Sequence, residues 1–143
     1  MLKKLKDINQ RYNDYFVTMD IVPTQKQIDQ LKSEISKVVN ISAFCLFFSF
    51  TTMFLAPAIL AIPSVLFIVV FFNISMKQDK NLKKIKPLDN NLIDKLKNYK
   101  YSPVFIDFQD CLIKNNEKRE ILIVEYETLM IKIEHNACAF SLL

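Results

Sequence analysis

The longest apolar segment of the chain covers residues 38–76, which hold no charged side chain and lie between Lys37 and Lys77. As one helix these 39 residues would be about 58 Å long, nearly twice the hydrocarbon thickness of a bilayer. Pro57 and Pro63 lie near the middle of the segment, and each removes a backbone donor and clashes with the preceding turn. The pattern therefore predicts a transmembrane hairpin of two helices.

The hairpin turn is predicted at residues 56–63, which leaves about 18 residues for each arm, close to the minimum for crossing the bilayer. A re-entrant hairpin that does not fully cross is the alternative. Lysines flank the segment on both sides and none lies in the turn, so we expect both termini to be cytoplasmic. The lysines after the hairpin, expected to contact lipid headgroups, are Lys77, Lys80, Lys83, Lys84 and Lys86.

Residues 1–37 form a first flank in which apolar residues recur at helical spacing. Apolar positions from Leu2 to Met19 predict an amphipathic helix. Thr24 then precedes Gln27 in the T-x-x-Q arrangement of a capping box, in which each side chain binds the other residue's amide. A second helix is therefore predicted to begin directly after Thr24.

Along this second helix a seam alternates spacings of three and four, as in a coiled coil. The residues of this seam are Ile28, Leu31, Ile35, Val38, Ser42, Cys45, Ser49, Thr52 and Ala56. Its members change from large aliphatic residues to small ones at the expected membrane boundary. In water the hydrophobic effect drives helices together, whereas in lipid close van der Waals contact between small residues does so. One continuous helix is expected to enter the membrane. The seam either binds further copies of the chain or packs on the second arm of the hairpin.

Residues 77–143 form a second flank in which three further helices are predicted. The first covers residues 91–100, and the second starts at Ser102-Pro103 and ends at Asn115. For the last segment, from Glu117 onward, we predict a helix, with a strand as the alternative because Ile121 to Val124 favour extended structure. The predicted helix carries a stripe that would pair with residues 28–38, made of Ile123, Tyr126, Met130, Ile133 and Ala137. The predicted fold class is all-α.

Glycine is absent from the chain, which excludes the phosphate loops and nucleophile elbows that require it. His135 is the only histidine and has no second ligand at metal spacing, and Asp107 with Asp110 fits a solvated helix face. The net charge of +4 comes mainly from lysines near the membrane and predicts contact with anionic lipid and not with nucleic acid. We therefore expect no enzyme, no cofactor and no metal.

The apolar segment contains Asn40 and Asn73 near its two ends, at similar depth in an antiparallel hairpin. They either bond across the arms or reach the headgroups. No acidic, basic or histidine side chain lies between the flanking lysines, so the proton relay or counter-ion of a transporter is missing. A pump or carrier is therefore disfavoured.

The layout of residues 24–56, the turn at Pro57 and Pro63, and the basic exit at residues 77–86 resembles the small two-transmembrane effectors of bacterial anti-phage systems, such as the SLATT proteins. The resemblance lies in topology and transfers no functional residue. It implies a protein of the bacterial inner membrane that forms homo-oligomers after a cytoplasmic sensor detects infection. Such oligomers permeabilise or depolarise the membrane in an abortive-infection response.

Two other functions fit the same pattern. Hydrophobic helices with both chain ends in the cytoplasm also resemble the inclusion-membrane proteins of intracellular bacteria, which act as scaffolds and recruit partners through cytoplasmic helices. An immunity or exclusion protein that binds an incoming toxin or transfer apparatus within the membrane is the other alternative.

Overall fold

The computed structural model describes the backbone of residues 1–55, 57–115 and 117–141, and the side chains as far as residue 137. Within these ranges the fold is helical, which confirms the predicted all-α class, and the one extended pairing is a short antiparallel bridge between Pro87 and Leu122. The chain divides into two units. The hairpin unit is Lys32–Lys83, and the flank unit combines Met1–Leu31 with Lys84–Leu143.

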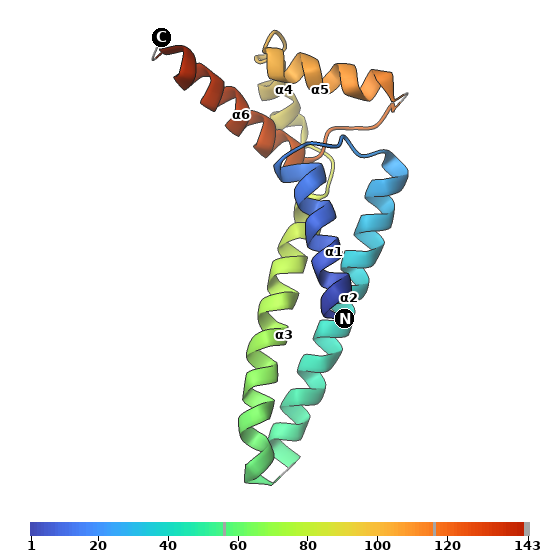
Figure 1. The fold of residues 1–143 in the computed structure, drawn as a ribbon, viewed down its shortest axis with the longest axis vertical. Helices are drawn as coiled ribbons and strands as arrows, with labels where there is room; N and C mark the ends of the chain where they lie inside the picture. Colours follow the sequence, from blue (N-terminus) through green and yellow to red (C-terminus); the bar gives the residue numbers. More distant parts are fainter. Residues whose placement is uncertain (56, 116, 142–143) are drawn as a thin grey trace. The chain divides into compact units, whose positions relative to one another are not determined.

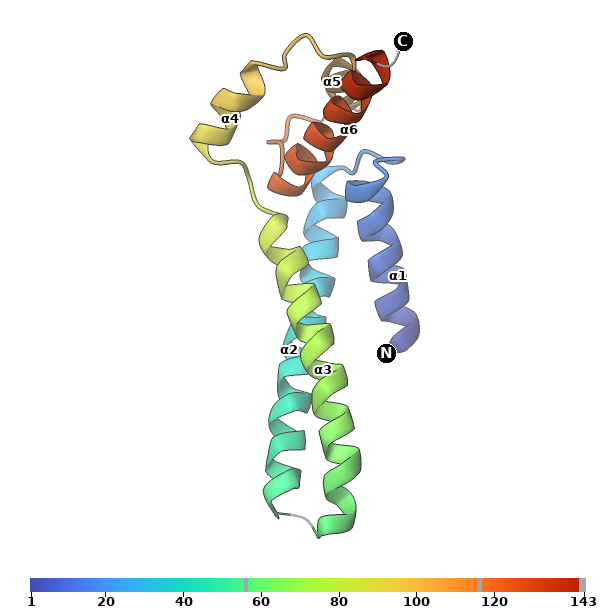
Figure 2. The same cartoon turned by 90° about the vertical axis from the view of Figure 1, so that its left-hand side faces the viewer.

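The hairpin unit consists of two long helices that run antiparallel and side by side (Figures 1 and 2). Helix α2 covers Gln25–Leu55 and helix α3 covers Ala58–Lys84. Because α2 begins in the flank unit and runs without a break to Leu55, the predicted continuation of one helix into the apolar segment is confirmed.

The turn of the hairpin is shorter than predicted. α2 ends at Leu55 and α3 begins at Ala58, so Pro63 lies inside α3 and the predicted turn through residue 63 is wrong. Proline removes only one bond of the helical ladder, whereas an irregular segment would leave several backbone groups unpaired in apolar surroundings. The hydroxyl of Ser64 also donates to the carbonyl of Leu60, at 2.8 Å, beside the gap left by Pro63.

The flank unit begins with helix α1, Leu2–Tyr12, which continues into a π-helical turn, η1, Asn13–Val17. The chain then reverses at Met19, whose φ of 56° is left-handed, so the first helix ends before the predicted residue. The predicted capping box at the start of α2 is confirmed. The amide of Thr24 donates to Gln27 Oε1 at 2.9 Å, and the amide of Gln27 donates to Thr24 Oγ1 at 3.3 Å.

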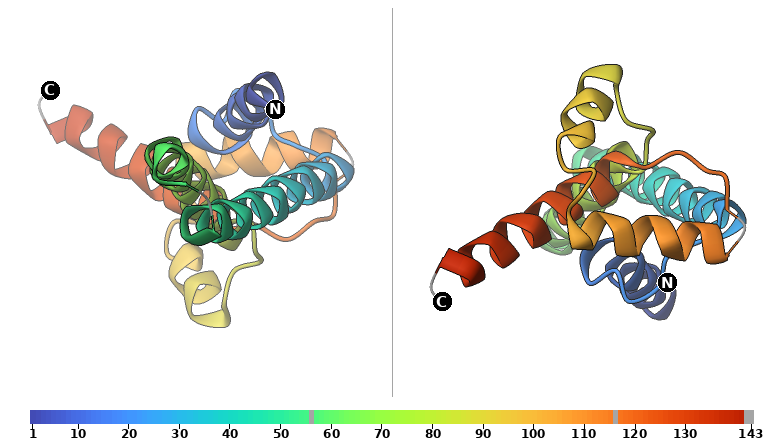
Figure 3. Two further views of the ribbon diagram at one scale, coloured as in Figure 1. Left: turned by 90° about the horizontal axis from the view of Figure 1, so that it is seen from below. Right: turned by 90° about the horizontal axis from the view of Figure 1, so that it is seen from above.

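Three shorter helices complete the flank unit: α4, Asn90–Lys97; α5, Pro103–Lys114; and α6, Ile123–Ser141. The second of them starts as predicted, with Ser102 at the N-cap and proline at the first helical position. α5 and α6 lie against each other, as the right-hand view of Figure 3 shows. The buried core cluster of these helices contains Leu96, Phe105, Phe108, Leu112 and Leu129.

The last helix begins later than predicted, and its predicted stripe covers only part of its buried side. Tyr126 and Met130 of the stripe pack against the core cluster, whereas the most buried side chains of the helix lie at other positions. Residues 117–121 form neither helix nor strand, so the predicted helix from Glu117 is wrong for this part, and the strand alternative is limited to the bridge at Leu122. The buried side chains of α6 include Glu125 and Leu129, whereas the predicted stripe is half-buried or exposed. Leu129 packs on the aromatic face of α5, and this contact sets which side of the helix is buried.

Candidate functional site

The outer surface of the hairpin is apolar. Only 17% of the most apolar stretch of α2 and 6% of that of α3 is buried inside the chain, unlike a core helix of a water-soluble protein. Burial of each large apolar side chain would contribute about 1.5–3 kcal/mol of stabilisation, which is lost if the side chain stays in water. Exposed members of this surface include Phe44, Phe47, Phe48, Phe54, Ile59, Ile62 and Leu66. The surface thus matches the interior of a bilayer.

A groove of about 390 Å³ lies between the two arms. α2 contributes Phe44, Cys45, Phe48, Ser49 and Thr52, and α3 contributes Leu60, Pro63, Ser64, Phe67 and Phe71. The hydroxyls of Thr52 and Ser64 donate to carbonyls of their own helices, each at 2.8 Å. In this arrangement the protons of these two hydroxyls are used within their own helices, and their oxygens keep lone pairs that accept further bonds.

The predicted seam is buried within the chain over its first five positions, Ile28, Leu31, Ile35, Val38 and Ser42. The next three, Cys45, Ser49 and Thr52, line the groove opposite α3, and Ala56 lies outside the described residues. Three positions of the seam thus lie opposite the second arm, and binding of further copies through the seam stays a prediction. The hydroxyl of Ser42 is 0% exposed and has no hydrogen-bond partner in the part of the chain that the structure describes.

The lysines after the hairpin divide into two groups. Lys77, Lys80 and Lys86 are exposed. Lys83 pairs with Asp79, and Lys84 pairs with Glu127 of α6, each at 2.7 Å. The pair of Lys84 with Glu127 joins the end of α3 to α6, a contact that the sequence did not indicate because Glu127 lies 43 positions further along the chain.

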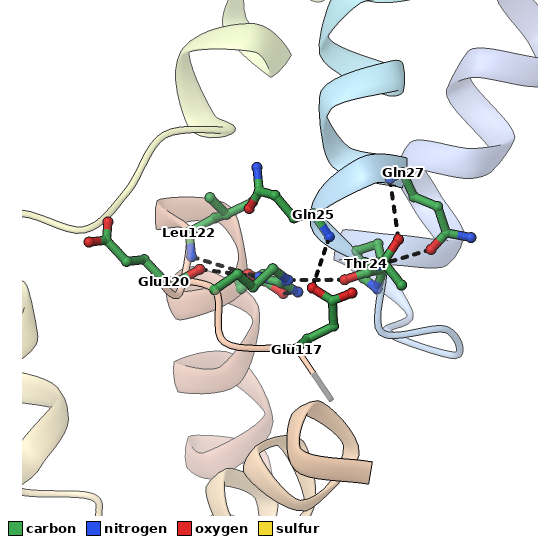
Figure 4. Close-up of polar contacts among 9 residues, drawn as sticks. Thr24, Gln25, Gln27, Glu117, Glu120 and Leu122 are labelled. Atoms are coloured by element: carbon green, nitrogen blue, oxygen red, sulfur yellow. Dashed lines mark hydrogen bonds and ion pairs between the residues drawn. The ribbon is translucent and has the colours of Figure 1, made fainter. Parts of the chain in front are cut away.

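A second group of polar contacts lies at the start of α2 (Figure 4). Here residues 117–127, which we call the clasp segment, contact the chain that precedes the hairpin. The amide of Gln25, in the first turn of α2, donates to the carboxylate of Glu117 at 3.2 Å. The Nε of Arg119 donates to the carbonyl of Pro23 at 3.0 Å. A carboxylate at a helix N-terminus is favourable because the first amides of a helix lack partners.

The clasp segment also bonds to the chain after α3. The amide of Ile123 donates to the carbonyl of Lys86 at 2.9 Å, and the amide of Leu88 donates to the carbonyl of Ile121 at 3.2 Å. Together with the pair of Lys84 and Glu127, these bonds fix the end of α3. The clasp segment thus contacts the flank-unit ends of both hairpin arms.

A buried ion pair organises the clasp segment. The guanidinium of Arg119 binds both carboxylate oxygens of Glu125, at 2.6 and 2.7 Å, and the two side chains are 2% and 0% exposed. One of these oxygens also accepts the amide of Leu122 at 3.1 Å, which caps the start of α6. Such a pair tolerates the loss of neither partner, because the remaining charge would stay buried.

Sequence reasoning missed this ion pair. Arg119 and Glu125 lie six positions apart, which is not a helical neighbour spacing, so no pattern joined them. The one available signal was Glu125 two residues after Ile123, the position from which a glutamate reaches back to the N-cap amide. That signal becomes visible only when the start of α6 is known.

The C-terminal helix also caps the π-helical turn. Lys132 donates to the carbonyl of Thr18 at 2.7 Å, and the hydroxyl of Thr128 donates to the carbonyl of Phe16. Nearby, burial and, to a smaller degree, the charge of Glu127 raise the pKa of Tyr12 to about 12. Tyr12 therefore remains a neutral phenol at physiological pH.

The remaining candidate residues show no site. Asn40 and Asn73 are exposed on the hairpin, and Asp107, Asp110 and His135 are exposed on the flank unit. Among the described residues, no group of three or more potential ligands lies close enough together to hold a metal ion.

The fold and the groove define an all-helical protein with two helices that are long and apolar enough to cross a membrane. No family model matches the chain, and no curated protein or solved structure matches it.

Proposed function

We propose that the chain is a non-enzymatic effector of the bacterial inner membrane, in which the hairpin spans the bilayer and both termini are cytoplasmic. The observation that carries the proposal is the uncharged, outward-facing apolar surface of α2 and α3, which only lipid or another copy of the hairpin would cover. Copies assemble through their hairpins and depolarise the membrane in an anti-phage response.

Assembly is required because two helices do not enclose a water-filled path. Several hairpins around an axis would place hydroxyl groups of Ser42, Ser49 and Thr52 toward the centre, since these are the polar residues on one face of α2. In the single chain this face lies in the groove or is buried. Opening of the groove is therefore the step that would permit assembly.

The test is inducible expression in a bacterial host, with a membrane-potential dye and propidium uptake as readouts. Ser49→Leu fills the groove and blocks close packing, so depolarisation should be lost. Ala43→Leu is the matched control, because it adds the same side chain to the exposed side of the same helix and should leave depolarisation unchanged. Depolarisation that is absent in the wild type, or equal in all three proteins, would reject the proposal.

A scaffold is the second candidate, because α5 also presents an exposed apolar stripe. Ile106 and Ile113 lie seven positions apart, and therefore on one face, and both are exposed, at 42% and 71%. Such a stripe suits a helical partner in the cytoplasm, such as a sensor or regulator. Normal growth on expression, with a bound protein that Ile113→Lys releases, would favour this function over the effector.

A further inference from the structure

The flank-unit ends of both hairpin arms attach to the same short stretch of chain. The clasp segment holds the start of α2 through Arg119 and Glu117. It holds the end of α3 through two backbone bonds and the ion pair of Lys84 with Glu127. The two attachments come from residues far apart in the sequence, so their connection exists only in the folded chain.

The clasp segment contacts the first turn of α2, the helix that continues into the hairpin unit. The helix runs from Gln25 to Leu55 with no proline or glycine within it, and kinks in helices arise almost always at such residues or at local defects. The first turn that the clasp segment binds therefore belongs to the same unbroken helix as the groove residues of α2. The end of α3 is restrained in the same way at Lys84.

The shape of the clasp segment depends on one guanidinium group. Arg119 bonds to the carbonyls of Pro23 and Glu120 and to both oxygens of Glu125. The same group therefore closes the segment on itself and ties it to the chain before α2. Because both charged side chains are buried, loss of either partner would leave the other charge buried without its counter-ion.

We propose that the clasp segment is a latch that keeps the two arms of the hairpin together, and that its release frees the groove face of α2 for contact with other copies. The inference rests on the proposed function and names its regulation. While the latch is closed, Cys45, Ser49 and Thr52 face α3 across the groove. Release lets the arms separate and presents these small residues to a neighbouring hairpin.

The experiment measures the separation of the arms directly, by electron spin resonance on the full chain in lipid bilayers. Spin labels replace Ala43 and Asn73, which are exposed on opposite arms, and serine replaces Cys45, Cys111 and Cys138. Glu125→Gln removes the charge that holds Arg119 but keeps an acceptor for the cap of α6. We expect at least about a tenfold larger population of long distances, since a lost charge-assisted bond weakens the closed state by roughly this factor or more.

Two further variants separate release from general damage to the fold. Lys84→Met breaks only the half-exposed pair at the α3 side, so it should lengthen distances to a smaller degree while the helix content stays unchanged. Lys97→Met breaks an exposed ion pair in α4 that lies outside the clasp segment, and it should match the wild type. Unchanged distances in both Glu125→Gln and Lys84→Met would overturn the latch.

The same variants, without labels, are then scored for depolarisation. Faster depolarisation by Glu125→Gln than by the wild type is the expected result. If the arms separate but depolarisation does not increase, although Ser49→Leu still abolishes it, the latch does not control assembly and the inference is wrong. If no variant depolarises the membrane while the arms still separate, the effector function fails and the action of the latch on the arms stands.

Discussion

Replacing Arg119 by methionine is expected to be among the most damaging single changes in the flank unit. Arg119 and Glu125 are 2% and 0% exposed, so the substitution leaves a carboxylate buried with the amide of Leu122 as its remaining donor. Breaking a buried pair from one side costs about 3–5 kcal/mol. This cost is a large share of the about 5–15 kcal/mol by which a whole protein is stable.

The assay is amide hydrogen exchange on the full chain in detergent micelles, which reports the free energy of opening for each helix. Arg119→Met should lower this free energy for α6 and for the first turn of α2, the two regions that Arg119 joins. Exchange in the middle of α4 is an internal reference. Lys97→Met, at an exposed pair, should change the free energy by less than about 1 kcal/mol.

A double-mutant cycle makes the reasoning refutable. Glu125→Leu alone should also be costly, whereas the double variant Arg119→Met with Glu125→Leu should recover most of the loss, because two apolar side chains leave no buried charge. A cost below about 1 kcal/mol for Arg119→Met would show that the pair is not buried as described. Additive costs in the double variant would show that the two side chains act independently.

Three further predictions concern stability. Leu129→Ala should destabilise the flank unit by about 2–5 kcal/mol in chemical denaturation, because Leu129 is 1% exposed in the core cluster, whereas Ile131→Ala, at a 65% exposed position, should change it by less than about 0.5 kcal/mol. Thr24→Ala should cost about 1 kcal/mol and speed amide exchange at Gln27, since it removes half of the capping box. Burial raises the pKa of Tyr12 to about 12 in the folded chain, against 10 in the unfolded chain. The stabilising contribution of Tyr12 is therefore complete below pH 10 and is lost between pH 10 and 12. Tyr12→Phe should flatten this alkaline decline of stability, and an unchanged decline would contradict the prediction.

Local patterns in the sequence predicted the hairpin and most helix starts. A long uncharged segment must become helical wherever water is absent. The T-x-x-Q box acts through bonds between residues three positions apart, and proline at the first helical position acts through its fixed φ, so neither depends on the rest of the fold. Two starts were wrong. The last helix begins at Ile123 and not at Glu117, and α3 begins before Pro63, which the sequence placed in the turn. Apolar surroundings make continued helix cheaper than an open turn, so the structure keeps Pro63 in α3.

Only the tertiary structure decided how the flanks combine. Residues before and after the hairpin form one unit, in which Glu117 and Arg119 bond to Gln25 and Pro23. The sequence predicted a contact between the flanks through an apolar stripe and did not predict these polar bonds, because their partners lie 92 and 96 positions apart. The buried side of α6 was also set by its contact with α5 and not by its own heptad pattern. Local patterns determine helices because their bonds are local, whereas a buried ion pair and a shared core depend on contacts that form only when distant segments meet.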